Sequence, residues 1–384
     1  MRILILHSTY LSGPISGENR VVADESRLLR EAGHEVGVWA PSPDVSGPLG
    51  PVRAGVSAIW SSKAAREVEG VVRRKKIEIV HAHNLFPSLS PAVLRSARSA
   101  GASVLVTLHN YRMMCLPANL LRDGSICEAC IGHLPWRGIV HRCYRGSALG
   151  SAALATSLVA HRGIGTFAGV ERFLAVSGFV RDKYIEAGMR PEQVAVKSNF
   201  SWALDHRDGP GKYFLYLGRL APEKGVDTLM AAWRSRAPRH PLVVIGDGPD
   251  ADMLRHNAPD GVEFRGQVSA DEAGAALAHA RALLVPSRWY EAAPRSIIEA
   301  YAAGVPVVAS DIGALPEAVE SGVSGRLVPP DDAKAWAETV GSLDDAESLR
   351  LGAGALGLWE ERFSPERGLE GLETAYRGAV AVSA

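Results

Sequence analysis

The chain has 384 residues, and its 42 lysines and arginines balance 42 aspartates and glutamates, so its formal net charge is zero. This balance argues against a general nucleic-acid-binding protein, which needs a basic excess to neutralise phosphates. It also argues against a highly charged disordered chain, because 47% of the residues are hydrophobic and only 22% are charged. The length suggests two domains, or three at most.

No apolar run approaches the roughly 20 residues that a membrane-spanning helix needs. The run at the start of the chain stops at His7, which is too short for a secretory signal. We therefore expect a cytoplasmic protein with reduced cysteines. The basic run at residues 73–76 has two interpretations: peripheral contact with anionic lipids at the inner face of the membrane, or a solvated helix end.

Short aliphatic runs alternate with longer amphipathic ones along the chain. Most of the short runs lack polar alternation, which is typical of strands covered on both faces in a parallel sheet. We predict strands at 2–6, 35–39, 77–81, 103–108, 172–176, 193–196, 213–217, 242–245, 262–265, 282–285 and 305–309. Residues 18–32 predict a helix that ends at Gly33 and carries Glu25 as the polar exception on its apolar face. This alternation predicts an α/β fold with doubly wound parallel sheets.

Residues 205–211 are polar and rich in glycine and proline, and they predict a linker between two similar halves. The carboxyl ends of the strands in two such sheets would line a shared ligand-binding cleft.

The most informative motif is EAAPRSIIEA at residues 291–300. Pro294 suits the first turn of a helix, which places Glu291 in the preceding loop and Glu299 inside the helix. The start of that helix would offer amides to a phosphate, and the two carboxylates would offer acceptors to hydroxyl groups. On spacing alone, a solvated acid pair on a surface helix is the alternative.

Three further segments follow predicted strands. Arg219 and Lys224 lie in a glycine-flanked turn after the strand at 213–217, well placed to hold a diphosphate. The loop at 13–19 contains Gly13 and Gly17 before a helix, although it is not the G-x-G-x-x-G pattern of dinucleotide-binding proteins. His109 directly follows the strand predicted at 103–108. Each of these segments alone also fits an ordinary exposed loop.

Taken together, these motifs resemble the retaining, nucleotide-sugar-dependent glycosyltransferases of family 4, which have the GT-B fold. The matching pieces are the glycine loop, TLHNY at 107–111, GRLAPEKG at 218–225, IGDGP at 245–249, FRGQVS at 264–269 and EAAPRSIIEAYAAG at 291–304. The resemblance covers essentially the whole chain. It implies an N-terminal Rossmann-like acceptor-binding domain at 1–205, with a cysteine-rich insert at 111–147. It also implies a Rossmann-like nucleotide-sugar-binding domain at 206–362 and a C-terminal helix at 363–384 that returns to the first domain.

The family pattern assigns a role to each matching position. Arg219 and Lys224 would neutralise the donor diphosphate, and Gly17 and Asn19 would contact it from the first domain. Glu291 would contact the donor sugar, and His109 would lie beside it. The remaining donor-binding positions are Glu299 at the ribose, Ala293 and Ser296 with backbone amides near the donor, and Gly266, Gln267 and Val268 at the nucleobase. Many relatives have paired glycines where this chain has Ser16 and Gly17, which weakens the phosphate assignment there.

The resemblance thus implies a retaining transferase of the hexosyl or N-acetylhexosaminyl type. It would move a sugar from a UDP- or GDP-sugar to a hydroxyl group of a glycan, lipid-linked or small-molecule acceptor, in polysaccharide or glycoconjugate biosynthesis. Cations and a helix start would stabilise the departing diphosphate, so catalysis would need no cofactor. The alternatives are a nucleotide-sugar isomerase or hydrolase of the same fold and a catalytically silent nucleotide-sugar-binding module.

The four cysteines are confined to the loop-like insert, with the spacing Cys115-x11-Cys127-x2-Cys130-x12-Cys143. The central C-x2-C pair is typical of zinc ligands, and two further thiols complete four. We predict a structural zinc ion that organises this long loop. Two disulfides, a redox-active C-x2-C pair and four unconnected thiols are the alternatives.

Overall fold

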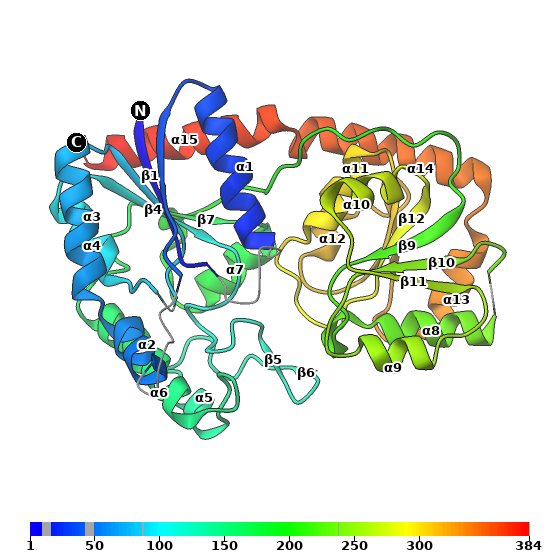
Figure 1. Ribbon diagram of the computed structural model, residues 1–384, viewed down its shortest axis with the longest axis horizontal. Coiled ribbons are helices and arrows are strands. Elements are labelled where there is room, and N and C mark those ends of the chain that lie inside the picture. Colours follow the sequence, from blue (N-terminus) through cyan, green and yellow to red (C-terminus); the bar gives the residue numbers. More distant parts are fainter. Residues whose placement is uncertain (10–16, 43–49, 87, 237, 384) are drawn as a thin grey trace. The chain divides into compact units, whose positions relative to one another are not determined.

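The computed structural model describes residues 1–9, 17–42, 50–86, 88–236 and 238–383, and it divides into two compact units (Figure 1). The first unit comprises residues 1–122, 127–198 and the chain from 368 onward, and the second comprises 123–126 and 199–367. Each unit contains one six-stranded parallel sheet with helices around it. The predicted α/β class with two Rossmann-like, doubly wound sheets is confirmed.

The sheet of the first unit has the strand order β2-β1-β3-β4-β7-β8. The central strand β1 pairs in parallel with β2 on one side and β3 on the other, so the direction of winding reverses between β1 and β3. The strands are β1 (Arg2–His7), β2 (Glu35–Trp39), β3 (Ile79–Asn84), β4 (Ser103–Leu108), β7 (Arg172–Ala175) and β8 (Val194–Val196).

Helix α15 (red in Figure 1) packs on the same face of this sheet as α1. Leu372 and Tyr376 of α15 share a core cluster with Ile3 and Ile5 of β1 and with Leu29 of α1. The helices of this unit are α1 (Gly17–Glu31), α2 (Gly50–Ile59), α3 (Ser62–Lys75), α4 (Ala92–Ser99), α5 (Trp136–Val140), α6 (Ala148–Gly163), α7 (Gly178–Glu186), the 3₁₀ turn Pro191–Gln193, and α15 (Pro365–Ser383) from residue 368 onward.

The sheet of the second unit has the order β11-β10-β9-β12-β13-β14, which is the 3-2-1-4-5-6 order of a dinucleotide-binding fold. Leu215 of the first strand pairs with Val243 on one side and Leu283 on the other, so the winding reverses between β9 and β12. The strands are β9 (Tyr213–Leu217), β10 (Leu242–Ile245), β11 (Val262–Gly266), β12 (Ala280–Val285), β13 (Val307–Ser310) and β14 (Gly325–Val328).

Helices cover both faces of the second sheet. One face packs Trp233 and Trp336, and the other packs Tyr301 and Trp359. The helices are the 3₁₀ turn Pro222–Lys224, α8 (Val226–Ser235), α9 (Ala251–His256), α10 (Ala270–Leu277), α11 (Arg295–Ala302), α12 (Leu315–Ala318), α13 (Ala333–Ser342), α14 (Asp345–Leu358) and the π-helical turn Trp359–Phe363.

Some elements differ from the sequence-based expectation. Strand β3 runs to Asn84 rather than ending at residue 81, and β14 was not expected. Residues 205–211, expected as a linker, lie within the second unit, where the Arg207 guanidinium donates to the Ser348 hydroxyl (2.8 Å) and to the Arg281 carbonyl. The cysteine-rich segment contains the short strands β5 (Leu121–Arg122) and β6 (Ser125–Ile126).

Among the described residues, no helix combines the length and the apolar character needed to span a membrane.

A glycine allows two loops at the carboxyl edge of the second sheet to touch. Gly225 ends the turn after β9 with a φ of +68°, and a Cβ atom there would lie 2.0 Å from the carbonyl oxygen of Pro286, in the loop after β12. The Arg288 amide donates to the Glu223 carbonyl (2.9 Å) and holds the same two loops together. Any side chain at position 225 would separate them.

We predict that Gly225→Ala lowers the free energy of unfolding of the second unit by about 2 kcal/mol or more, because it combines a positive φ with a backbone clash. Urea denaturation checks this. Gly341→Ala is the matched control, because Gly341 lies in α13 with no atom within 4 Å of its would-be Cβ. It should leave stability unchanged or raise it by up to about 1 kcal/mol. Equal effects of the two substitutions would contradict the close approach.

Candidate functional site

In the second unit, two loops that carry sequence motifs meet at the point where the winding reverses. The loop after β9 contains Lys224, and the loop after β12 contains Glu291. The Lys224 ammonium lies 2.7 Å from Oε1 of Glu291 and 5.1 Å from the centre of the Trp289 ring. Open α/β sheets bind ligands at this position, outside the carboxyl ends of the strands.

Glu291 is a buried carboxylate held by two donors. It is 5% exposed, and its Oε1 accepts hydrogen bonds from Lys224 and from the Ser287 hydroxyl (2.6 Å). Burial alone would raise the pKa of this carboxyl, but the neighbouring ammonium and these hydrogen bonds hold the pKa below its usual value. Glu291 is therefore an anion and a hydrogen-bond acceptor at neutral pH, not a general acid.

Arg219 begins the turn after β9 and remains accessible. Its guanidinium pairs with Glu223, four residues later, while 56% of its side chain is exposed. Its carbonyl oxygen accepts a hydrogen bond from the buried Tyr216 hydroxyl at 2.7 Å. The backbone of the turn is thus fixed while the cationic group stays available to a ligand.

Helix α11 begins at Arg295, so Pro294, expected in the first turn, is the N-cap residue just before it. Ala293 precedes this helix, and Ser296 lies in its first turn, where backbone amides lack intrahelical acceptors. Glu299 lies one turn further and pairs with Arg295 at 3.3 Å. The two acids of the motif therefore differ: Glu291 is buried in the loop, and Glu299 is half-buried on the helix.

The predicted nucleobase-contacting segment begins at Gly266, the last residue of β11. Gly266 has a φ of +69°, and its carbonyl oxygen accepts a hydrogen bond from the Gly246 amide at 2.8 Å. Gln267 comes next, and Val268 packs against the core of the second unit. The hydrogen bond between Gly246 and Gly266 joins the IGDGP motif to the FRGQVS motif at the same edge of the sheet.

In the first unit, the predicted phosphate loop is described only from Gly17 onward, because residues 10–16 lie outside the described part of the chain. Gly17 is the first residue of α1. The carbonyl oxygen of the Asn19 side chain lies 2.7 Å from Nε2 of His7, the last residue of β1. His7 therefore orients Asn19, and sequence reasoning did not single it out.

His109 follows β4 and contacts a second histidine. Its Nε2 lies 2.9 Å from Nδ1 of His83, and the two rings stack with an interplanar angle of 22°. Burial lowers the pKa of His109, although Glu18 and Glu25 act in the opposite direction. His109 is therefore predominantly neutral near pH 7.

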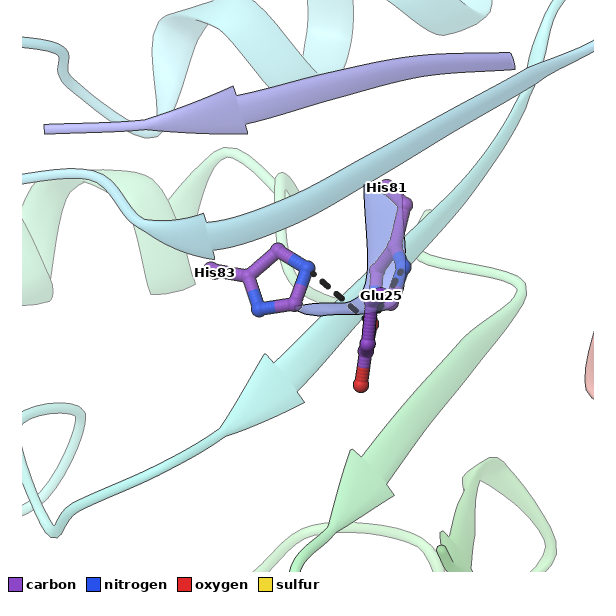
Figure 2. A group of neighbouring side chains, drawn as sticks. All are labelled: Glu25, His81 and His83. Atoms are coloured by element: carbon purple, nitrogen blue, oxygen red, sulfur yellow. Dashed lines mark ion pairs between the residues drawn. The ribbon is translucent and has the colours of Figure 1, made fainter. Parts of the chain in front are cut away.

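Behind His109 lies a buried cluster that the sequence did not reveal. Glu25 of α1 is fully buried, and its Oε1 is paired with the Lys197 ammonium, which follows β8. Its Oε2 faces His83 Nε2 at 3.5 Å and His81 Nδ1 at 3.9 Å, as the dashed lines in Figure 2 show. The H-x-H spacing of residues 81 and 83 was the available signal, but both histidines lay at or beyond the predicted end of their strand.

Two histidines and a carboxylate could in principle bind a metal ion. Two observations argue against that use here. The Lys197 ammonium already neutralises Glu25. Both ring nitrogens of His81 are engaged, with Nδ1 2.9 Å from the Tyr376 hydroxyl and Nε2 2.7 Å from the Thr107 hydroxyl. The cluster is therefore better described as a buried hydrogen-bonding and ion-pairing network.

The four cysteines lie in the first unit, and none of them is part of a disulfide. Burial raises the pKa of the Cys115 and Cys130 thiols, while Cys127 and Cys143 are half-buried. Over the described residues, Glu25, His81 and His83 form the only group of three or more His, Cys, Asp or Glu ligand atoms that lie within 4.8 Å of one another. The sulfur atoms do not form so tight a group, and the structural zinc site stays a prediction.

Metal analysis of the purified protein tests that prediction. We expect about one zinc ion per chain, and we expect a chelator to speed amide exchange in the segment 111–147, since structural zinc contributes directly to folding. Metal-free protein with four titratable thiols would contradict it.

Because His81 and His83 are buried, we predict that the protein loses stability in acid. Burial lowers the pKa of His81 and His83 well below their ordinary value of 6.5, so the unfolded chain binds more protons than the folded chain just below that pH. Stability should therefore fall as the pH drops from about 7 to 5, by up to about 1.4 kcal/mol per pH unit for each histidine. Urea midpoints over this range measure it.

His81→Gln should reduce this pH dependence, because it removes one of the buried histidines whose pKa is lowered by burial. His133→Gln is the matched control, because His133 is an exposed histidine of the same unit and should leave the slope unchanged. If neither substitution changes the slope of stability against pH, the buried histidine at position 81 is not a cause of the acid sensitivity.

Comparison with known proteins gives consistent results for both units. The family described as Glycosyl transferase 4-like domain matches residues 16–199, and the one described as Glycosyl transferases group 1 matches residues 211–345. The chain is 30% identical over 352 residues to a phosphatidyl-myo-inositol mannosyltransferase of Mycolicibacterium smegmatis, covering 85% of this chain and 81% of that protein. It is 34% identical over 164 residues to a GDP-mannose-dependent alpha-(1-6)-phosphatidylinositol monomannoside mannosyltransferase of Mycobacterium tuberculosis, covering 38% of this chain and 43% of that protein.

Solved structures show the same fold at low sequence identity. HepE of Anabaena in complex with UDP superimposes with a TM-score of 0.67 at 19% identity, covering 97% of this chain and 99% of that one. Sucrose-phosphate synthase of Thermosynechococcus elongatus superimposes with a TM-score of 0.68 at 18% identity, covering 99% of each chain. These likenesses confirm the predicted GT-B fold.

Proposed function

The chain belongs to the glycosyltransferases of family 4, and on that premise we propose that it transfers a sugar, with retention of anomeric configuration, from a nucleoside-diphosphate sugar to an acceptor hydroxyl group. One observation carries the proposal. The 2.7 Å contact between Lys224 and Glu291 joins a cation suited to phosphate and an anion suited to sugar hydroxyls. Both residues stand where the second sheet reverses its winding, which is where such sheets bind nucleotides.

The proposed donor site divides into a phosphate part and a sugar part. Lys224 has three N–H donors, so its bond to Glu291 leaves others for the diphosphate. Arg219, which is largely exposed, adds a second cation, and the first turn of α11 adds amides at Ser296. The ionised Glu291 accepts hydrogen bonds from the sugar, and Glu299 accepts them from the ribose.

This division of charge accounts for catalysis by differential binding. Negative charge develops on the diphosphate as the glycosidic bond breaks, and cations already positioned there stabilise the transition state more than the ground state. In the proposed retaining reaction, the acceptor attacks on the face that the diphosphate leaves. The departing phosphate oxygen takes the acceptor's proton. Because Glu291 is held as an anion by Lys224, it stabilises charge and orients the sugar.

In the first unit, His109 is proposed to contact the transferred sugar, and Gly17 and Asn19 are proposed to contact the donor phosphates. Supporting this, His109 follows β4, Asn19 is oriented by His7 at the end of β1, and both positions adjoin the carboxyl edge of the first sheet. The acceptor is proposed as a hydroxyl-bearing glycan, lipid-linked or small molecule. The basic run at 73–76 forms the last turn of α3 and its left-handed cap, so contact of that helix end with anionic lipid is part of the proposal.

A thermal-shift screen with UDP, GDP, ADP and their sugars tests donor binding. One nucleoside diphosphate should raise the melting temperature, since ligand at 100 times its Kd adds about 2.7 kcal/mol. GDP-mannose and UDP-glucose are the first donors to compare, because the mannosyltransferase relative is named for the former and HepE is found with UDP. No response to any nucleotide would contradict the proposal.

Substitutions locate the site. Lys224→Met should weaken nucleoside-diphosphate binding about 10- to 100-fold, because it removes a charge-assisted contact. Lys334→Met is its matched control, because Lys334 is a highly exposed lysine of the same unit. Glu291→Gln should lower the transfer rate, with Glu338→Gln, an exposed acid on α13, as control. If Lys224→Met binds the nucleoside diphosphate as tightly as the unaltered protein does, Lys224 is not part of the donor site.

Donor incubated without acceptor separates the other enzyme classes. Rapid release of free sugar, followed by NMR, would indicate a hydrolase, and a new nucleotide sugar would indicate an isomerase. A transferase should consume the donor only slowly until an acceptor is supplied.

A further inference from the structure

A continuous buried path links the carboxylate of Glu25 to the ring of His109. Oε2 of Glu25 faces Nε2 of His83 at 3.5 Å, and Nδ1 of His83 lies 2.9 Å from Nε2 of His109. Within the described part of the chain, Oε2 of Glu25 and Nε2 of His83 make no hydrogen bond, so the 3.5 Å ion-pair contact is the polar contact that joins them. Figure 2 shows both His81 and His83 directed towards this carboxylate. The path uses three side chains from α1, β3 and the end of β4.

The charge at one end of this path fixes the protons along it. A neutral histidine carries one N–H, and the nitrogen that faces a carboxylate is the one that keeps it. His83 therefore holds its proton on Nε2, towards Glu25, and its Nδ1 is an acceptor. His109 must then donate from Nε2, which leaves its own Nδ1 with a lone pair.

Lys197 helps to keep Glu25 ionised near neutral pH. Glu25 is fully buried and Lys197 is 5% exposed, so each would be destabilised without the other. Burial alone would raise the pKa of Glu25, but the Lys197 ammonium holds that pKa below its usual value. The carboxylate of Glu25 faces the His83 ring directly, so it sets the tautomer of that ring.

We propose that Glu25 and His83, with Lys197, are positioning residues that lock His109 in the Nε2–H tautomer and present its Nδ1 as a hydrogen-bond acceptor to the transferred sugar. This rests on the proposed function, in which His109 contacts that sugar. A sugar hydroxyl can donate to such a nitrogen, whereas an Nδ1–H tautomer would present a donor instead. The network thus selects which hydrogen bond the histidine can make.

Other titratable groups surround this path and enter any pH dependence. They are Glu18 on α1, His7 on β1, His81 on β3, Lys197 after β8 and Tyr376 on α15. Lys197 and His7 lower the pKa of His109, and Glu18 and Glu25 raise it. Because these act together, the test reads the tautomer directly rather than a pH profile alone.

Long-range ¹H–¹⁵N NMR on protein with ¹⁵N-labelled histidine reports which ring nitrogen carries the proton. The chain has 12 histidines, and the spectra of His109→Gln and His83→Gln assign the two signals. In the unaltered protein near pH 7.5, we expect the Nε2–H form to dominate at both His83 and His109, by about tenfold or more. Predominance of the Nδ1–H form at His109 would overturn the proposal without any variant having to fold.

Glu25→Gln tests the cause. The amide of glutamine can donate to Nε2 of His83, which would move the proton of His83 to Nδ1 and that of His109 to Nδ1. We expect the Nδ1–H form of His109 to become the major one, or a mixture to appear. Glu31→Gln, at an exposed acid of the same helix, is the matched control and should leave both tautomers unchanged. Unchanged tautomers in Glu25→Gln would also overturn the proposal.

The same labelled protein separates this inference from the proposed function and from metal binding. Binding of a nucleoside diphosphate tests the second unit and does not depend on the histidine tautomers. Addition of Zn²⁺ to chelator-treated protein should leave the His81 and His83 signals in place. If the ion shifts both of them and is held with Glu25, the cluster is a metal site and the positioning role fails.

Discussion

Parallel pairing of strands is the constraint on which the rest of this structure depends. In a parallel sheet every strand ends at the same edge, so residues far apart in the chain come together there. In the second unit this constraint brings the turn after β9 to the loop after β12, where Lys224 meets Glu291, 67 residues later in the sequence. In the first unit it places the ends of β1, β3 and β4 together, with His7, His83 and His109 at them.

The formal net charge of the chain is zero, but charges are unevenly distributed within each unit. Each unit contains one carboxylate that is almost completely removed from water and is stabilised by one lysine: Glu291 with Lys224, and Glu25 with Lys197. Burial of an unpaired carboxylate would favour its protonated form, and the ammonium reverses that preference. Each ion pair therefore holds a carboxylate ionised at a defined position, and it adds little to the free energy of unfolding.

The sequence predicted most of the fold because uninterrupted aliphatic runs are a strong signal for buried parallel strands. It missed β14, whose Gly325 and Arg326 break that pattern. It ended β3 too early, because His81, His83 and Asn84 are polar and look unlike residues of a core strand, although all three are buried. The motifs around Lys224 and Glu291 were visible as local patterns. The pairing of Glu25 with Lys197 was not, because it joins residues that only the fold brings together.

The two ion pairs differ in how they can reach a substrate, and this difference explains their proposed roles. The side chain of Lys224 is 21% exposed, so its ammonium can add a phosphate contact while keeping Glu291. Lys197 and Glu25 are sealed, at 4% and 0% side-chain exposure, so no substrate can touch them. A sealed anion can influence chemistry only through the groups it contacts, and its path to the protein's edge runs through His83 to His109. The Glu25 carboxylate cannot bind a ligand itself. In the proposed network it still determines, through His83, which hydrogen bond His109 offers to a ligand.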